Sequence, residues 1–170
     1  MIIKIIGAIL IISASGSFGL LMAATHKRTA KIMQELISAI DFMMRDLQYR
    51  MCSLADAFRA VSSYNSGVIG DFFNILSNEL ERQVAPDIAY CVDAALSQIK
   101  NLPELVRKDI LLLGKSLGRF DLDGQLKGLS AVKAECTNTL QAFTDNQDIR
   151  LRSYQTLALC AGAAVVILFI

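Results

Sequence analysis

Hydrophobic side chains recur at steps of three and four residues through most of the chain, which is the spacing of one face of an α-helix. The clearest example lies between residues 29 and 51, where charged residues fill the gaps between apolar ones: Met33, Leu36, Ile37, Ile40, Met43, Met44, Leu47 and Met51. We find no run with the strict alternation of apolar and polar residues that a half-buried strand requires. The pattern therefore predicts an all-α protein.

Local signals divide the middle of the chain into shorter helices. Ser53 is a typical N-cap residue with Asp56 in the turn that follows, and residues 62–67 (Ser-Ser-Tyr-Asn-Ser-Gly) have the composition of a loop. Pro86 and Pro103 are well placed in the first turns of new helices. Together with the long helix before residue 51, these signals predict an antiparallel bundle of about six helices, the later ones being a short helix through 57–61 and helices over 68–82, 87–99, 104–117 and 121–152.

Both ends of the chain are apolar. Residues 5–24 carry no charge, and about 20 residues at about 1.5 Å per residue span about 30 Å, the thickness of the hydrocarbon layer of a bilayer. Residues 156–170 are also uncharged, and Tyr154 is suited to the membrane interface. We expect transmembrane helices over 1–24 and 154–170, each continuous with the helix beside it, and a helical domain over 25–153.

Each end has an alternative interpretation. Lys4, the apolar residues 5–12 and the small residues 13–15 would fit a cleaved secretory signal. The apolar run continues to residue 24, which favours a retained helix. The C-terminal segment would fit a buried core helix, but it lacks the polar positions that such a helix shows on its outer face.

Charge near the two apolar segments predicts the orientation. Basic residues lie just inside both segments, and only Lys4 lies outside them. The inner basic residues are His26, Lys27, Arg28, Lys31, Arg150 and Arg152. Because positive residues favour the cytoplasmic side of a membrane, we expect a cell-membrane protein whose domain over 25–153 is cytoplasmic.

Composition argues against several functional classes. Residues 25–153 contain 16 Lys and Arg (17 in the chain less Lys4) and 16 Asp and Glu, so they lack the basic excess of nucleic-acid-binding proteins. Cys52, Cys91, Cys136 and Cys160 form no C-x-x-C pair, and we expect reduced thiols rather than disulfides.

No pattern of catalytic or ligand-binding residues stands out. Gly114-Lys115-Ser116 resembles the end of a P-loop, but Asp109 stands where that motif needs its first glycine. His26 is the single histidine, which leaves little basis for a metal site or a histidine-dependent active site. We therefore expect no enzyme activity, no metal and no cofactor.

The segment 112–125 stands apart because it is rich in glycine between two predicted helices. In one interpretation it is a turn, in which Gly118 ends one helix in a left-handed conformation and Asp121 caps the next. In the other, the corner also exposes Lys115, Arg119 and Gln125 to a protein partner. The residues alone favour the turn.

The same segment carries a family resemblance. The pattern Leu113-Gly114, Leu117-Gly118, Asp121 and Gln125, between an N-terminal and a C-terminal span, resembles the stage III sporulation protein AB family of endospore-forming Firmicutes. Residues 1–7 (Met-x-x-Lys-x-x-Gly), Arg28 and residues 53–57 (Ser-Leu-Ala-Asp-Ala) fit as well. The family usually has proline at position 53 and often tryptophan near position 91, both absent here.

The resemblance implies a non-enzymatic platform or adaptor in the channel complex that joins mother cell and forespore, located in the mother-cell membrane that faces the forespore. The domain would resemble the platform proteins of type II secretion and type IV pilus systems. Its expected partners are the secretion-type ATPase stage III sporulation protein AA, other stage III sporulation proteins, membrane lipid and further copies of itself. We expect partner contacts at Gly114, Lys115, Gly118, Arg119, Asp121 and Gln125. The alternative is a membrane-anchored sensing or signalling module.

Overall fold

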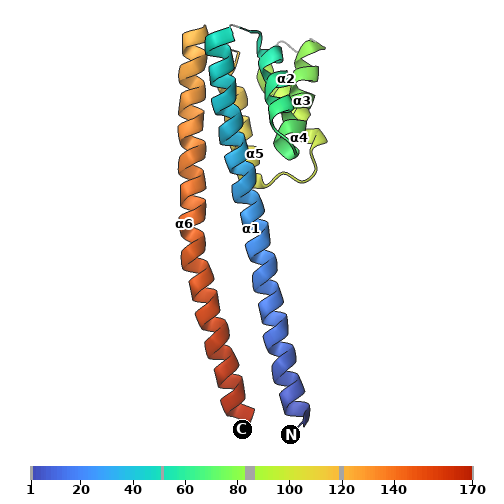
Figure 1. Cartoon of the computed structure of the whole chain (residues 1–170), viewed down its shortest axis with the longest axis vertical. Coiled ribbons are helices and arrows are strands. Elements are labelled where there is room, and N and C mark those ends of the chain that lie inside the picture. Colours follow the sequence, from blue (N-terminus) through green and yellow to red (C-terminus); the bar gives the residue numbers. More distant parts are fainter. Residues whose placement is uncertain (1, 51, 83–86, 119–120, 170) are drawn as a thin grey trace. The chain divides into compact units, whose positions relative to one another are not determined.

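The computed structural model of the chain is helical throughout the part it describes (Figure 1). It describes the backbone of residues 2–50, 52–82, 87–118 and 121–169, and the side chains of these ranges between residues 24 and 145. The helices are α1 (Ile2–Arg50), α2 (Leu54–Tyr64), α3 (Val68–Glu81), α4 (Ile88–Gln98), α5 (Glu104–Ser116) and α6 (Leu122–Phe169). Since the described backbone holds six helices and no strand, the predicted all-α class is confirmed.

Two compact units make up the chain. One unit is Lys31–Leu140, and the other consists of residues 1–30 and 141–170. α1 and α6, which are 49 and 48 residues long, each contribute to both units.

The unit Lys31–Leu140 is a bundle around one apolar core, to which all six helices contribute. α2 packs on α3, α3 on α4, and α4 on α5. Phe58, Phe72 and Phe73 are fully buried, with ring centroids 5.7 Å apart for Phe58 and Phe73 and 5.1 Å for Phe72 and Phe73. Burying each of these rings contributes roughly 1.5–3 kcal/mol, which makes this cluster a main source of the stability of the bundle.

The apolar spacing in the C-terminal half of α1 corresponds to its buried face. Five of the positions that sequence periodicity assigned to the core have side chains that are only 0–3% exposed: Met33, Leu36, Ile40, Met43 and Leu47. Ile37 and Met44 pack against the core while remaining partly exposed. The methionines of α1 at these positions thus serve as core residues.

Helix ends follow most of the local signals, but α2 continues to Tyr64, so the prediction of a loop over 62–67 was wrong for its first three residues. The Ser53 hydroxyl oxygen accepts a 3.2 Å hydrogen bond from the Asp56 backbone N–H, as an N-cap should, and the φ of Ser53 is −67°, a value that proline also adopts. Asp87 caps α4 by accepting from the Ala89 N–H at 3.1 Å. Pro103 was predicted in the first turn of its helix and lies one residue earlier, at the N-cap of α5. Pro86 lies outside the described residues.

In the unit formed by the two chain ends, the rings of His26 and Phe143 approach with centroids 5.3 Å apart. A search of the side chains that the structure describes finds no helix with the length and apolar character needed to cross a bilayer. The predicted spans, 1–24 and 154–170, fall outside those side chains except for Ala24. Both spans therefore stay predictions, as do the domain boundaries.

Candidate functional site

The glycine-rich segment contains the end of α5 and the start of α6, and we call its described residues, 112–118 and 121–125, the α5–α6 corner. Gly118 has a φ of +78°, in the left-handed region that glycine adopts without a steric cost. The Asp121 carboxylate accepts a 3.1 Å hydrogen bond from the Gly124 N–H, which satisfies a free donor at the start of α6. The predicted turn, with Gly118 after the helix end and Asp121 as the cap, is therefore confirmed.

Both glycines of the repeated Leu-Gly pair allow α5 to approach α4 closely. A side-chain carbon added at Gly114 would lie 3.0 Å from Cγ2 of Val92, and one added at Gly118 would lie 2.5 Å from Cδ1 of Ile88. Ile88 and Val92 are one turn apart on α4, so the two contacts form a single line of packing. Leu113 and Leu117, the other members of the repeat, are buried in the core. The repeat thus has a packing role that its sequence does not reveal.

Only some of the predicted partner-binding residues present side chains at the surface. Lys115 and Asp121 are exposed, and Gln125 is partly exposed and has interactions of its own. Arg119 lies outside the described residues. On either side of the corner the apolar side chains of Leu112 and Leu122 are 38% and 39% exposed. The corner therefore presents charged and apolar side chains on a backbone that packs against α4.

A buried carboxyl group lies on α5, one to two turns before the corner. Asp109 is only 5% exposed, and among the described side chains its Oδ2 is the buried oxygen that lacks a hydrogen-bond partner. Burial raises the pKa of Asp109, hydrogen bonding with the Cys136 thiol of α6 lowers it, and the negative charge of Glu135 raises it. Burial and the nearby Asp109 in turn raise the pKa of Cys136 to about 12.

Sequence reasoning missed this pair. Asp109 follows Val106 by three residues and precedes Leu113 by four, so it lies on the apolar face of its helix. That position was the available signal for a buried carboxyl group. The identity of its neighbour Cys136 had no local signal.

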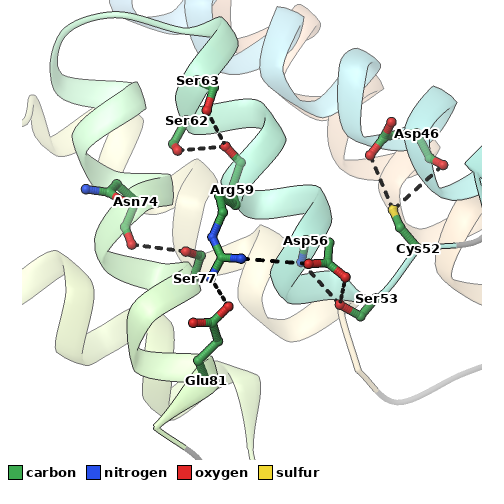
Figure 2. A network of polar contacts seen from close by, with 10 residues as sticks. All are labelled: Asp46, Cys52, Ser53, Asp56, Arg59, Ser62, Ser63, Asn74, Ser77 and Glu81. Carbon is green, nitrogen blue, oxygen red and sulfur yellow. Dashed lines mark hydrogen bonds and ion pairs between the residues drawn. The ribbon is translucent and has the colours of Figure 1, made fainter.

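A second polar network ties α2 to its neighbours (Figure 2). The Cys52 thiol, just before α2, donates a 3.2 Å hydrogen bond to Asp46, which is 8% exposed on α1. The Arg59 guanidinium on α2 donates to Glu81 on α3 and lies 3.9 Å from Asp56. Burial is the main cause of the raised pKa of the Cys52 thiol, and the hydrogen bond to Asp46 raises it further. These contacts join α1 to the residue before α2, and α2 to α3.

Comparison with known proteins gives a consistent result. A family model described as "Stage III sporulation protein AB (spore_III_AB)" matches residues 4–170. A solved structure titled "Stage III sporulation protein AB (SpoIIIAB)" superposes with a TM-score of 0.63 at 14% identity, covering 72% of this chain and 98% of that one. At this level of identity the superposition shows a shared fold. No curated protein matches the sequence.

Proposed function

Because the chain belongs to the stage III sporulation protein AB family, and is thus a sporulation protein, we propose that it is a non-enzymatic membrane platform in the channel complex between mother cell and forespore. The observation that carries the proposal is the family match over residues 4–170, which takes in the bundle and nearly all of both predicted spans. In this role the protein couples a secretion-type ATPase to the membrane components of the complex.

The proposed location is the mother-cell membrane that faces the forespore. Residues 1–24 and 154–170 anchor the chain, and residues 25–153 lie in the cytoplasm, where an ATPase can reach them. The exposed side chains of Lys27, Arg28 and Lys31, directly after the first predicted span, support this orientation because basic residues concentrate on the cytoplasmic side.

We place the contact with the ATPase, stage III sporulation protein AA, at the α5–α6 corner. Gly114 and Gly118 pack against α4, and the Asp121 carboxylate caps α6, so contacts fix the described residues on either side of 119–120. A preorganised surface loses little conformational entropy on binding. The exposed Lys115 and Asp121, beside the partly exposed Leu112 and Leu122, offer the mixed charged and apolar surface on which protein partners dock.

A pulldown of the ATPase with the full-length protein tests this contact. Lys115→Glu reverses a charge at the corner, and Lys108→Glu makes the same change at another exposed position of the same helix. We expect Lys115→Glu to weaken capture of the ATPase by roughly tenfold, a loss of about 1.4 kcal/mol, and Lys108→Glu to leave it unchanged.

Two results would contradict the proposal at different levels. Equal capture by the wild type and Lys115→Glu would remove the corner from the interface. Failure of the wild-type protein to capture the ATPase from membranes that contain the other stage III sporulation proteins would remove the coupling role itself.

A further inference from the structure

α5 and α6 meet along a mostly apolar seam below the corner. At one end a side-chain carbon added at Gly128 would lie 3.3 Å from the backbone oxygen of Ser116, so the helices nearly touch there. At the other end Asp109 faces Cys136. On these two helices, five further residues are 0–2% exposed and belong to the apolar core: Val106, Ile110, Leu113, Leu129 and Val132.

An aspartate at position 109 destabilises the closed seam. A buried carboxylate oxygen that has lost water and gained no partner destabilises the closed state, and the cost is larger when the group is charged. Two responses relieve the cost. The group takes up a proton while the seam stays closed, or the seam opens and water solvates the charge.

Of the two groups that face Asp109 from α6, the Cys136 thiol stabilises its charge through a hydrogen bond, but the pKa stays raised because the effect of burial is larger. Cys136 keeps its proton, and Glu135 is itself negative. On its own helix, Arg107 is 3.9 Å from Glu104, and Lys108 is exposed. Within the described residues, therefore, no lysine or arginine compensates a charge on Asp109.

The neighbouring helices offer no compensation either. On the α4 side, Val92 closes against α5 at Gly114. Basic groups of α1 and α6 are paired elsewhere: Lys133 donates to Asp41, and Arg50 donates to Asp46. Glu35 is 3.8 Å from Lys31.

From this geometry we propose that the α5–α6 seam is a proton-linked latch, which is closed when Asp109 carries a proton and opens when Asp109 releases it. Opening hydrates the carboxyl group, which then ionises as an ordinary aspartate does. Because the pKa of Asp109 is higher in the closed seam than in water, raising the pH favours the open seam.

Amide hydrogen exchange of the full-length protein in detergent micelles tests the latch. Exchange is measured between about pH 4 and about pH 8, with correction for the intrinsic chemical rate. In peptides covering 106–116 and 129–136, the opening constant should rise by up to about tenfold per pH unit between the ordinary pKa of aspartate and the raised pKa of Asp109, and then level off. Peptides of α2 and α3 report global unfolding, which also exposes Asp109, so a local opening of the seam requires faster exchange in 106–116 and 129–136 than in α2 and α3 at every pH.

Three variants separate the latch from simple loosening of the seam. Asp109→Asn retains the shape and cannot ionise, so its opening constant should be independent of pH. Asp109→Leu should hold the seam closed at every pH. Asp46→Asn removes a different buried carboxyl group, one with partners, and should keep the pH dependence of the wild type. A seam whose opening in the wild type is constant over this range, or remains equally pH-dependent in Asp109→Asn, would overturn the proposal.

Discussion

Gly67 and Gly118 share a left-handed backbone but have different surroundings. Their φ values are +82° and +78°, and a side-chain carbon at Gly67 would meet nothing within 4 Å, whereas one at Gly118 would meet Ile88 at 2.5 Å. An alanine held at such a positive φ costs roughly 1–3 kcal/mol, and the ψ of −156° places Gly67 in a region that is essentially restricted to glycine. We expect Gly67→Ala to lower the free energy of unfolding by about this amount and Gly118→Ala to lower it by roughly 1 kcal/mol more.

Denaturant unfolding of both variants measures the difference. Ile88→Val, which removes the Cδ1 atom that meets position 118, supplies the control. It should recover part of the extra loss when combined with Gly118→Ala and none when combined with Gly67→Ala. Equal destabilisation by the two alanines would show that α4 does not pack against the corner as described.

Thiol reactivity provides a second prediction for individual residues. Cys136 is fully buried and its pKa is raised to about 12, so near about pH 8 only about one molecule in ten thousand carries the reactive thiolate. Cys52 is partly exposed and should react first. Alkylation with iodoacetamide followed by mass spectrometry should modify Cys136 only after denaturant is added. Modification of native Cys136 as fast as Cys52 would contradict its placement in the seam.

At the level of the helix, the cap of α2 contributes a defined share of stability. Ser53→Ala removes the oxygen that accepts from the Asp56 N–H and should lower the free energy of unfolding by about 1 kcal/mol. Ser66→Ala, a matched change in the exposed loop before α3, should have a negligible effect. Equal losses in the free energy of unfolding for Ser53→Ala and Ser66→Ala would show that the α2 cap adds nothing to stability.

An ion pair between Lys133 and Asp41 joins α6 to α1 within the unit Lys31–Leu140. Lys133 Nζ lies 2.5 Å from Asp41, and both side chains are 38% exposed. The bond to Lys133 lowers the pKa of Asp41 below its ordinary value of 3.8, so its contribution is present above that pH and is lost as the pH falls through the lowered pKa.

Because solvent screens a half-exposed pair, we expect the coupling to be small. A double-mutant cycle with Asp41→Asn and Lys133→Met, measured by unfolding, should give at most about 1 kcal/mol near neutral pH and less in acid. Coupling of several kcal/mol, or coupling that grows as the pH falls, would contradict this account of the pair.

Across the whole molecule, sequence periodicity and the local signals for helix starts and ends predicted most of the helices. The helix expected over 68–82 is Val68–Glu81, and the one expected over 104–117 is Glu104–Ser116. This agreement has a local cause, because caps, glycines and the 3.6-residue period act within one or two turns. The turn at Gly118 and Asp121 was predictable for the same reason.

Contacts between helices were not predictable in this way. The sequence predicted a turn at Gly118, but it did not show that Gly114 and Gly118 pack against Val92 and Ile88 of α4. Likewise Asp109 was recognisable as buried, whereas its pairing with Cys136 depends on which helix packs against α5. Such contacts join segments far apart in sequence, so no local pattern encodes them.

The proposal of a cytoplasmic platform depends most directly on the side of the membrane that the bundle occupies. We would replace Cys52, Cys91, Cys136 and Cys160 and introduce Ser66→Cys in the exposed loop before α3. Intact cells would be treated with a membrane-impermeant thiol reagent, and the treatment repeated after lysis. Labelling only after lysis is the result we predict, since it places the bundle in the cytoplasm beside the ATPase. Labelling in intact cells would place the bundle outside, contradict the platform function and favour an external sensing module.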